Sequence, residues 1–154
     1  GPGGGRLPAG AGPGPTDPVY EPVAAADTAD FRPDLSVLMY PVATMADPHV
    51  HAGSRDFLLG ENPSPERIAA YSLEQMDWSG AAPVFLVHAI DDASVPVENS
   101  LQLLSTLKTA GVKAEAHLFQ EGGHGFGVRL IQGRPPQVWP DLTRAWAARL
   151  DFAL

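Results

Sequence analysis

Two short apolar runs constrain the fold of this chain most strongly. Residues 36–42 (SVLMYPV) and residues 83–89 (PVFLVHA) are almost wholly apolar and contain β-branched and aromatic side chains. A run of this length, bounded by turn-forming residues, is typical of a strand that is buried on both faces of a parallel sheet. Since parallel strands need crossover connections, helices are expected between them.

The segments around the two runs supply these connections. Residues 43–63 are interrupted by Pro48, Gly53 and Gly60 and predict a long loop. Ser64 followed by Pro65 predicts the start of a short helix. Its expected buried stripe is Ile68, Tyr71 and Met76.

The second half of the chain repeats the alternation. A helix is expected from near Val97 to Gly111, a third strand over residues 113–119 and a final helix over residues 140–152. The apolar positions that define the two helices are Val97, Leu101, Leu104 and Leu107 in the first, and Leu142, Trp146 and Leu150 in the second. Alternating strands and helices predict the α/β class, with a short parallel sheet and flanking helices.

Composition separates the first residues from the rest. Glycine and proline number 16 each, and residues 1–18 alone hold 7 glycines and 5 prolines. Such a segment buries too little apolar surface to fold by itself. We therefore expect a flexible leader over residues 1–18 and one folded domain over residues 19–154.

Charge and cysteine content exclude several classes of function. Ten Lys and Arg against 18 Asp and Glu give a net charge of −8, without a basic stripe that could neutralise phosphates. No apolar run approaches the ~20 residues that span a bilayer. We expect neither a nucleic-acid nor a membrane partner. The absence of cysteine rules out a disulfide framework or a thiolate nucleophile, but leaves a cytoplasmic or a secreted location open.

Polar residues follow two of the predicted strands at the edge where ligands gather in open α/β sheets. Asp91 and Asp92 come just after residues 83–89, and His124 lies in the glycine-rich loop after residues 113–119. An acidic pair in a loop is usually solvated, and a lone histidine is as often structural as functional. Placed together, a carboxylate and an imidazole form the orienting half of a hydrolytic triad.

Other candidates have simpler interpretations. His49 and His51 could be two metal ligands, but no third ligand stands at a fixed spacing, so we expect no metal site. His88 and His117 lie within strands and are interpreted as core histidines. Among the tryptophans, Trp146 is expected in the core and Trp139 at the surface.

Four stretches of this sequence carry a resemblance to a known family. They are RPDLSVLMYPV, HAGSRDFLLG, PVFLVHAIDDASVPVENS and GVKAEAHLFQEGGHGFG. Residues 32–127 resemble the C-terminal half of α/β-hydrolase esterases of the acetyl-xylan esterase and dienelactone-hydrolase-like group, bacterial enzymes that remove acyl groups from carbohydrates or small esters. The resemblance implies a carboxylic-ester hydrolase without a cofactor, acting on a small acyl or acetyl ester.

The same resemblance assigns residues. Asp92 matches the triad aspartate and His124 the triad histidine, with Asp91 as a solvated neighbour. Arg55, in the stretch HAGSR, matches a residue that pins its loop by pairing with a carboxylate.

The family's third catalytic residue is not found. These esterases carry a serine in a Gly-x-Ser-x-Gly elbow upstream of the stretch that resembles residues 36–42. None of the eight serines of this sequence has that context. Two interpretations stay open: a truncated or shortened esterase whose nucleophile comes from elsewhere, or a non-catalytic remnant that serves assembly or binding.

A shortened hydrolase would leave one strand exposed. Residues 36–42 would form a sheet edge with unpaired backbone groups, which readily pair with another chain. We therefore expect a homodimer formed through this edge.

Overall fold

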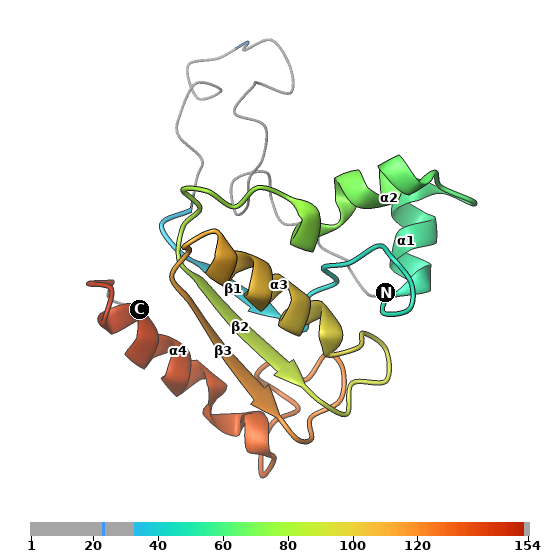
Figure 1. The fold of residues 1–154 in the computed structure, drawn as a ribbon. Helices are drawn as coiled ribbons and strands as arrows, with labels where there is room; N and C mark the ends of the chain where they lie inside the picture. Colours follow the sequence, from blue (N-terminus) through green and yellow to red (C-terminus); the bar gives the residue numbers. More distant parts are fainter. Residues whose placement is uncertain (1–22, 24–32, 153–154) are drawn as a thin grey trace.

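A three-stranded parallel sheet forms the centre of the protein (Figure 1). The structure is a computed structural model that describes Val23 and residues 33–152. The strands are β1 (Ser36–Met39), β2 (Val84–Ala89) and β3 (Ala114–Phe119), in the spatial order β1-β2-β3. In the register, Val84 of β2 lies beside Ser36 of β1 and Ala114 of β3. The predicted α/β class with a short parallel sheet is confirmed.

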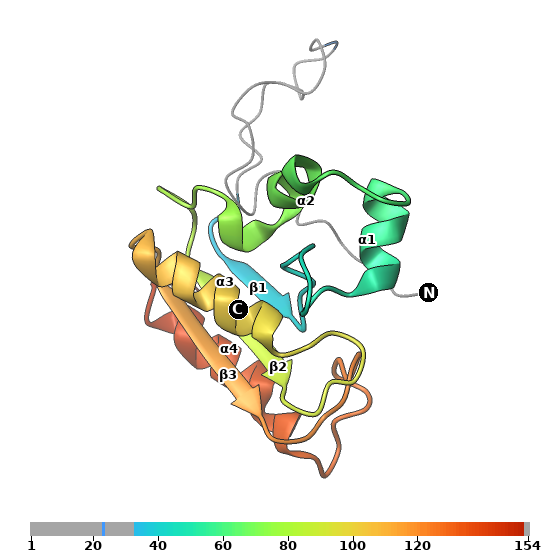
Figure 2. The same cartoon turned by 45° about the vertical axis from the view of Figure 1, so that its right-hand side comes forward.

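Helices cover both faces of the sheet. Helix α3 (Glu98–Thr109) packs Leu103 and Leu107 against Val84 and Leu86 of β2. Helix α4 (Trp139–Ala148) packs on the opposite face of the sheet. There Trp146 packs with the alternate residues of β2, which are Phe85, Val87 and Ala89. Figure 2 shows the two helices on either side of the sheet. Since successive side chains of a strand point to opposite faces, this three-layer packing explains why β2 is apolar throughout.

Strand β1 is shorter than its apolar run. The strand ends at Met39, because Tyr40 has a φ of 39°, in the left-handed region, and Pro41 has no N–H to continue the ladder. Tyr40 N–H still donates to the Val87 carbonyl, at 2.7 Å. The side chain of Tyr40 is thereby turned away from the strand direction at the carboxyl end of the sheet.

Helices α3 and α4 each differ in one detail from the sequence prediction. In α3, Leu107 is buried and Leu104 packs against the core as expected, but Leu101 is 45% exposed and Leu103 is buried in its place. Helix α4 ends at Ala148 rather than at residue 152, and a short 3₁₀ helix, η3 (Pro135–Val138), precedes it.

The predicted loop over residues 43–63 contains a helix. Helix α1 (Ala52–Leu59) is capped by His51, whose ring accepts a hydrogen bond from Ser54 N–H. Arg55 of this helix pairs with Asp47 at 3.1 Å, and so pins the preceding loop as the resemblance implied. The prediction of a loop here was wrong because α1 buries only Leu59 and has no apolar stripe.

The helix that Ser64 and Pro65 predict is present as α2 (Pro65–Tyr71), with Ser64 accepting from Arg67 N–H. Its expected buried stripe is only partly covered: none of the α2 residues is fully buried. A 3₁₀ helix, η2 (Leu73–Gln75), follows and lies against α3. The expected leader over residues 1–18 lies outside the described residues. Within residues 33–152, no helix is long and apolar enough to cross a membrane.

Candidate active site

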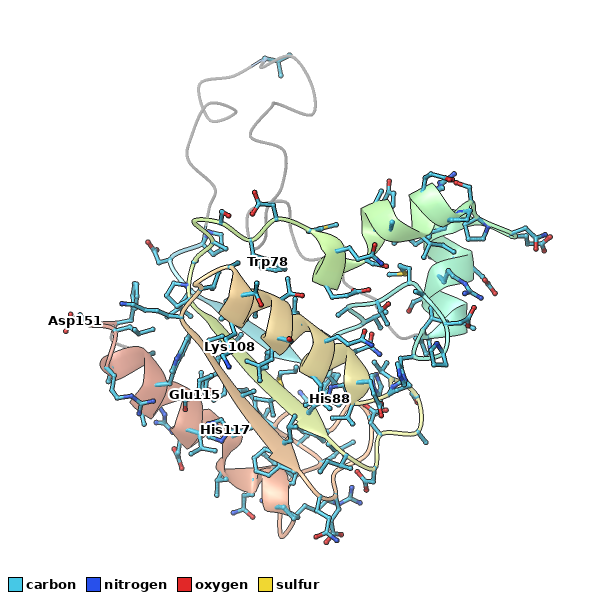
Figure 3. All side chains as sticks on the ribbon, viewed as in Figure 1. Trp78, His88, Lys108, Glu115, His117 and Asp151 are labelled. Carbon is cyan, nitrogen blue, oxygen red and sulfur yellow. The ribbon has the colours of Figure 1, made fainter. Side chains whose placement is uncertain are left out.

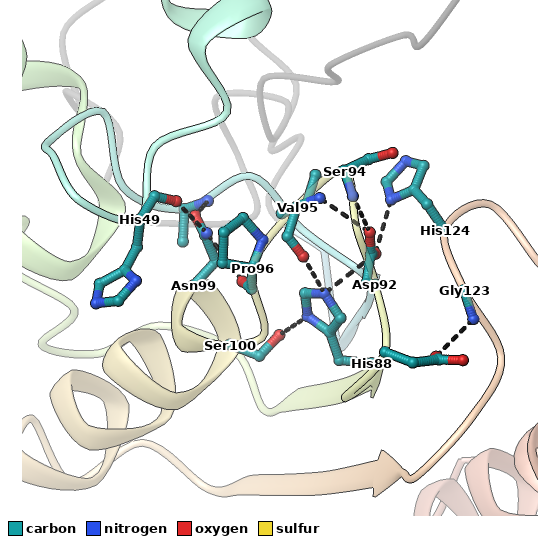
Figure 4. A network of polar contacts seen from close by, with 12 residues as sticks. His49, His88, Asp92, Ser94, Val95, Pro96, Asn99, Ser100, Gly123 and His124 are labelled. Carbon is teal, nitrogen blue, oxygen red and sulfur yellow. Dashed lines mark hydrogen bonds and ion pairs between the residues drawn. The ribbon is translucent and has the colours of Figure 1, made fainter.

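Asp92 and His124 meet at the carboxyl end of the sheet. Asp92 follows β2, His124 follows β3, and His124 Nδ1 lies 2.8 Å from Asp92 Oδ2 (Figure 4). The Asp92 side chain is fully buried, whereas the His124 side chain is 29% exposed. The structure therefore brings the two residues together in the geometry of an orienting carboxylate and a reachable imidazole.

The loop after β2 holds the Asp92 carboxylate in place. Its Oδ1 accepts two hydrogen bonds, from Ser94 N–H and Val95 N–H, each at 2.9 Å. Burial acts to raise the pKa of Asp92, but these backbone bonds and the bond from His124 outweigh it, so the pKa is lowered. Asp92 is therefore ionised at neutral pH.

The ionised carboxylate fixes the tautomer of His124. Because Asp92 Oδ2 can only accept, the neutral His124 ring carries its proton on Nδ1. Its Nε2 then has a free lone pair. A histidine in this state can take a proton from a hydroxyl group or a water molecule at Nε2.

Two glycines shape the loop that presents His124. Gly123 has a φ of 66°, which favours glycine. Gly122 packs so closely that a Cβ there would lie 3.0 Å from both the Ala89 side chain and the Pro136 ring. The loop is thus held against the end of β2 and against η3.

Asp91 has a defined partner as well. Its Oδ1 accepts from Gly123 N–H at 2.8 Å, next to His124 in the sequence. Asp91 is exposed, as expected, but it is more than a solvated neighbour, because it ties the His124 loop to the β2 loop. The consecutive Asp91 and Asp92 therefore hold the loop and the ring, respectively.

Tyr40 contributes an aromatic wall that the sequence did not reveal. Its ring meets the His124 ring edge to face, with centroids 4.8 Å apart, and the Phe126 ring at 5.1 Å. The left-handed backbone at Tyr40 directs the ring to this place. An aromatic residue at the end of a predicted strand, just before a proline, is the only sequence signal for it.

His88 lies behind Asp92. It is a fully buried histidine whose Nε2 bonds to the Val95 carbonyl at 3.0 Å, which confirms the interpretation of a core histidine bonded to backbone. Its Nδ1 also bonds to Ser100 Oγ, at 2.7 Å, and its Nε2 lies 3.3 Å from Asp92 Oδ2. Burial lowers the pKa of His88, although the bond to Val95 and the Asp92 charge oppose this.

Asn99 ties the loop after β1 to the same end of α3. Its Oδ1 accepts from Ala43 N–H and Thr44 N–H, and its Nδ2 donates to the carbonyls of His49 and Pro96. The side chain is fully buried, and all four contacts are between 2.8 and 3.0 Å. One turn of α3 therefore anchors both the β1 loop, through Asn99, and His88, through Ser100.

The remaining histidines have separate partners. His49 lies 3.8 Å from Glu98, and His51 bonds to Ser54. His117 was wrongly assigned to the core: it is partly exposed and pairs with Glu115 on the same strand (Figure 3). Among the described residues, no group of three or more His, Cys, Asp or Glu side chains could hold a metal ion.

The tryptophans follow the prediction in part. Trp146 is buried in the core, as expected. Trp139 was expected at the surface, but it is only partly exposed and donates from Nε1 to the Gly127 carbonyl. It thereby fixes the far end of the His124 loop onto α4.

Comparison with known proteins assigns the family. Residues 40–134, which include Asp92, His124 and both site loops, match the prolyl oligopeptidase family. The chain belongs to the prolyl oligopeptidase family. The α/β-hydrolase fold expected from the sequence is also confirmed, because solved α/β-hydrolase structures share this architecture.

Individual relatives of this prolyl oligopeptidase family chain include a xylanase and an acetylxylan esterase. It is 36% identical over 97 residues to endo-1,4-beta-xylanase B of Butyrivibrio fibrisolvens and 33% identical over 102 residues to an acetylxylan esterase of Xylanibacter ruminicola. These matches cover 63% and 64% of this chain. The resemblance to acetyl-xylan esterases is therefore confirmed.

Solved structures are similar over most of the chain, and one of them is an ester hydrolase by name. The acetyl ester-xyloside bifunctional hydrolase from Caldicellulosiruptor lactoaceticus is 38% identical, with a TM-score of 0.80 over 87% of this chain. The match spans 48% of that hydrolase, and the matches to the two curated relatives span 15% and 21% of their lengths. The chain thus spans less than half the length of each of these relatives. The residues matched to the family include Asp92 and His124 at the carboxyl end of the sheet.

Proposed function

We propose that this chain is a carboxylic-ester hydrolase in which Asp92 and His124 are the acid–base pair. The observation that carries the proposal is the 2.8 Å contact between a buried, ionised Asp92 and a partly exposed His124. In this mechanism Asp92 holds the Nδ1–H tautomer, and His124 Nε2 takes the proton of the attacking hydroxyl group. The same nitrogen then returns the proton to the leaving alcohol.

The proposed substrates are acyl esters, with acetyl esters first. Support comes from two relatives, an acetylxylan esterase and an acetyl ester-xyloside bifunctional hydrolase, which are 33% and 38% identical to this chain. The aromatic wall formed by Tyr40 beside His124 fits a small acyl group better than a charged one. We propose neither a metal ion nor a cofactor, because proton transfer at His124 requires neither.

The nucleophile is unidentified in this proposal. Within residues 33–152, no serine hydroxyl hydrogen-bonds to His124. A serine hydroxyl placed at Nε2 would give an acyl-enzyme, and a water molecule there would attack the ester directly. Either nucleophile depends on the same base, so the role of His124 is tested before the nucleophile is known.

A matched pair of variants tests the role of Asp92. Asp92→Asn keeps the shape of the side chain but presents an amide to His124. Since an amide can donate as well as accept, it no longer fixes the proton of His124 on Nδ1. We expect the rate of p-nitrophenyl acetate hydrolysis to fall on the order of 10²–10⁴-fold. The control is Asp56→Asn, the same change at an exposed position of α1, which should keep the wild-type rate. An Asp92→Asn variant with wild-type activity would refute the proposal.

The alternative is a non-catalytic hydrolase relative that serves assembly or binding. It is favoured by one sequence observation, the lack of a Gly-x-Ser-x-Gly context at any of the eight serines. Covalent labelling with a fluorophosphonate probe, followed by peptide mapping, separates the two functions. Labelling of a single serine, lost in His124→Ala, excludes the non-catalytic function; a chain that neither labels nor hydrolyses the ester supports it.

A further inference from the structure

His88 is a buried polar side chain for which the proposed reaction has no use. It occupies the same face of β2 as Val84 and Leu86, the face that packs against α3, and its side chain is completely buried. Burying an imidazole is unfavourable unless both of its nitrogens have partners. Both nitrogens of His88 have partners, Ser100 at Nδ1 and Val95 at Nε2, and Nε2 also lies close to the Asp92 carboxylate.

The contacts determine where the His88 proton is. The Val95 carbonyl can only accept, so His88 Nε2 carries the proton, and Nδ1 must accept from the Ser100 hydroxyl group. The Nε2–H group donates to Val95 at 3.0 Å and also lies 3.3 Å from Asp92 Oδ2. The one proton is thus shared between the Val95 carbonyl and the carboxylate.

The contacts form a continuous chain from α3 to His124 (Figure 4). The Ser100 hydroxyl group orients His88, the His88 ring reaches Asp92 Oδ2, and the same oxygen accepts from His124 Nδ1. Asp92 Oδ1 is meanwhile held by two backbone N–H groups. Both oxygens of the carboxylate therefore have donors besides His124, and the carboxylate plane of Asp92 cannot turn away from His124 without losing them.

We propose that His88, fixed by Ser100, is a positioning residue that holds Asp92 Oδ2 in the orientation that His124 requires. The proposal rests on the proposed function for the role it gives His124, but its test does not need the chain to be active. His88 acts through Asp92 and touches no reacting atom.

The charged surroundings suit a neutral His88. Asp92 faces it from the β2 loop, and His124 lies beyond Asp92 on the β3 loop. On β3 the register places His117 beside Val87, with its ring against Phe85 on the α4 face, so His117 does not face His88. On α3, Glu98 is directed to His49. A positive charge at His88 would compete with the Nδ1–H group of His124 for the same carboxylate oxygen, and complete burial disfavours that charge.

The test reads the histidine tautomers in the folded chain. Long-range ¹H–¹⁵N correlation spectra of the chain with ¹⁵N-labelled histidine, at neutral pH, report which nitrogen of each ring carries the proton. For the wild-type chain we expect Nε2–H at His88 and Nδ1–H at His124. His88→Leu removes the donor and should lower the ratio of Nδ1–H to Nε2–H at His124 about tenfold.

Three further variants keep the test decisive. His88→Gln can present an amide N–H near the position of Nε2 and should restore the wild-type tautomer of His124. Ser100→Ala removes one hydroxyl group, keeps the imidazole and should loosen the orientation of the His88 ring, with a smaller fall in the His124 ratio. The matched control is His117→Leu, the same change on the neighbouring strand, which should leave His124 unchanged. If His88→Leu does not fold, Ser100→Ala decides the test.

The outcomes separate this inference from the proposed function. A His124 tautomer ratio that stays at the wild-type value in folded His88→Leu, or in Ser100→Ala, overturns the inference, as does an Nδ1–H tautomer at His88 in the wild-type chain. Hydrolysis of p-nitrophenyl acetate is measured on the same samples. A wild-type chain that shows the expected tautomers but no hydrolysis refutes the proposed function and leaves the role of His88 standing.

Discussion

Asn99 provides the sharpest test of how the loop after β1 is held. Its Oδ1 accepts from two backbone N–H groups, at Ala43 and Thr44, which are 0% and 2% exposed. Asn99→Ala leaves both N–H groups buried without an acceptor. A buried unsatisfied donor costs about 1–3 kcal/mol, so the two together should lower the free energy of unfolding by about 2–6 kcal/mol. This is a large share of the about 5–15 kcal/mol that stabilises a typical domain.

A second substitution at the same position adds a pH dependence. Asn99→Asp keeps Oδ1 but places a carboxylate oxygen where Nδ2 donates to the carbonyls of His49 and Pro96. Burial and the two carbonyl oxygens both disfavour the charged form, so the folded-state pKa of the new carboxyl group should lie above its unfolded value of about 3.9. The folded state then binds the proton more tightly, and the stability lost at neutral pH should return as the pH falls through that folded-state pKa.

Urea unfolding, followed by the fluorescence of the buried Trp78 and Trp146, measures both effects. Gln102→Ala is the matched control, since it removes an amide from the same helix at a partly exposed position and should change stability by less than about 0.5 kcal/mol. A loss below about 1 kcal/mol for Asn99→Ala would show that the four hydrogen bonds do not anchor the loop. An Asn99→Asp variant that grows less stable relative to wild type on acidification would contradict the electrostatic argument.

Three further predictions concern the other parts of the fold. Burial lowers the pKa of His88 in the folded chain, so below the unfolded-state pKa of about 6.5 the unfolded chain binds more protons than the folded chain. The free energy of unfolding of the wild-type chain should therefore fall as the pH decreases below about 6.5, by at most about 1.4 kcal/mol per pH unit from this group. Thermal unfolding of folded His88→Leu should lack this contribution to the pH dependence. Gly122→Ala should lower the melting temperature and the esterase rate together, because the new Cβ would lie 3.0 Å from Ala89 and from Pro136; a variant with wild-type values of both would contradict the close packing. Within the described residues β1 pairs only with β2, so we predict a homodimer formed through the edge of β1; sedimentation velocity that shows a monomer at all concentrations would exclude it.

The sheet could be predicted from the sequence because burial on both faces leaves an unambiguous pattern. Strand β2 is apolar at every position except His88. Strands β2 and β3 each begin one residue later than predicted and end at the predicted residue. The candidate pair Asp92 and His124 followed from the same pattern, since each residue comes soon after a predicted strand. Their spatial contact required only that adjacent parallel strands end at the same edge.

The features that the sequence did not predict depend on tertiary contacts. Helix α1 has one buried residue, Leu59, and its exposed Phe57 and Leu58 break any apolar stripe. The leucines of α3 are so closely spaced that either Leu101 or Leu103 could face the sheet, and packing against β2 selects Leu103. The left-handed Tyr40 and its contact with His124 follow from the chain path after β1, for which the sequence has no specific signal.

The most direct test of the central claim is the rate of p-nitrophenyl acetate hydrolysis by His124→Ala beside the wild-type chain. The proposed mechanism predicts measurable hydrolysis by the wild-type chain and a loss on the order of 10²–10⁴-fold in His124→Ala. His49→Ala, the same change at a histidine that faces Glu98 instead of Asp92, should keep the wild-type rate. Hydrolysis that continues at the wild-type rate in His124→Ala would contradict the account, because the base that it assigns would then have no part in the reaction.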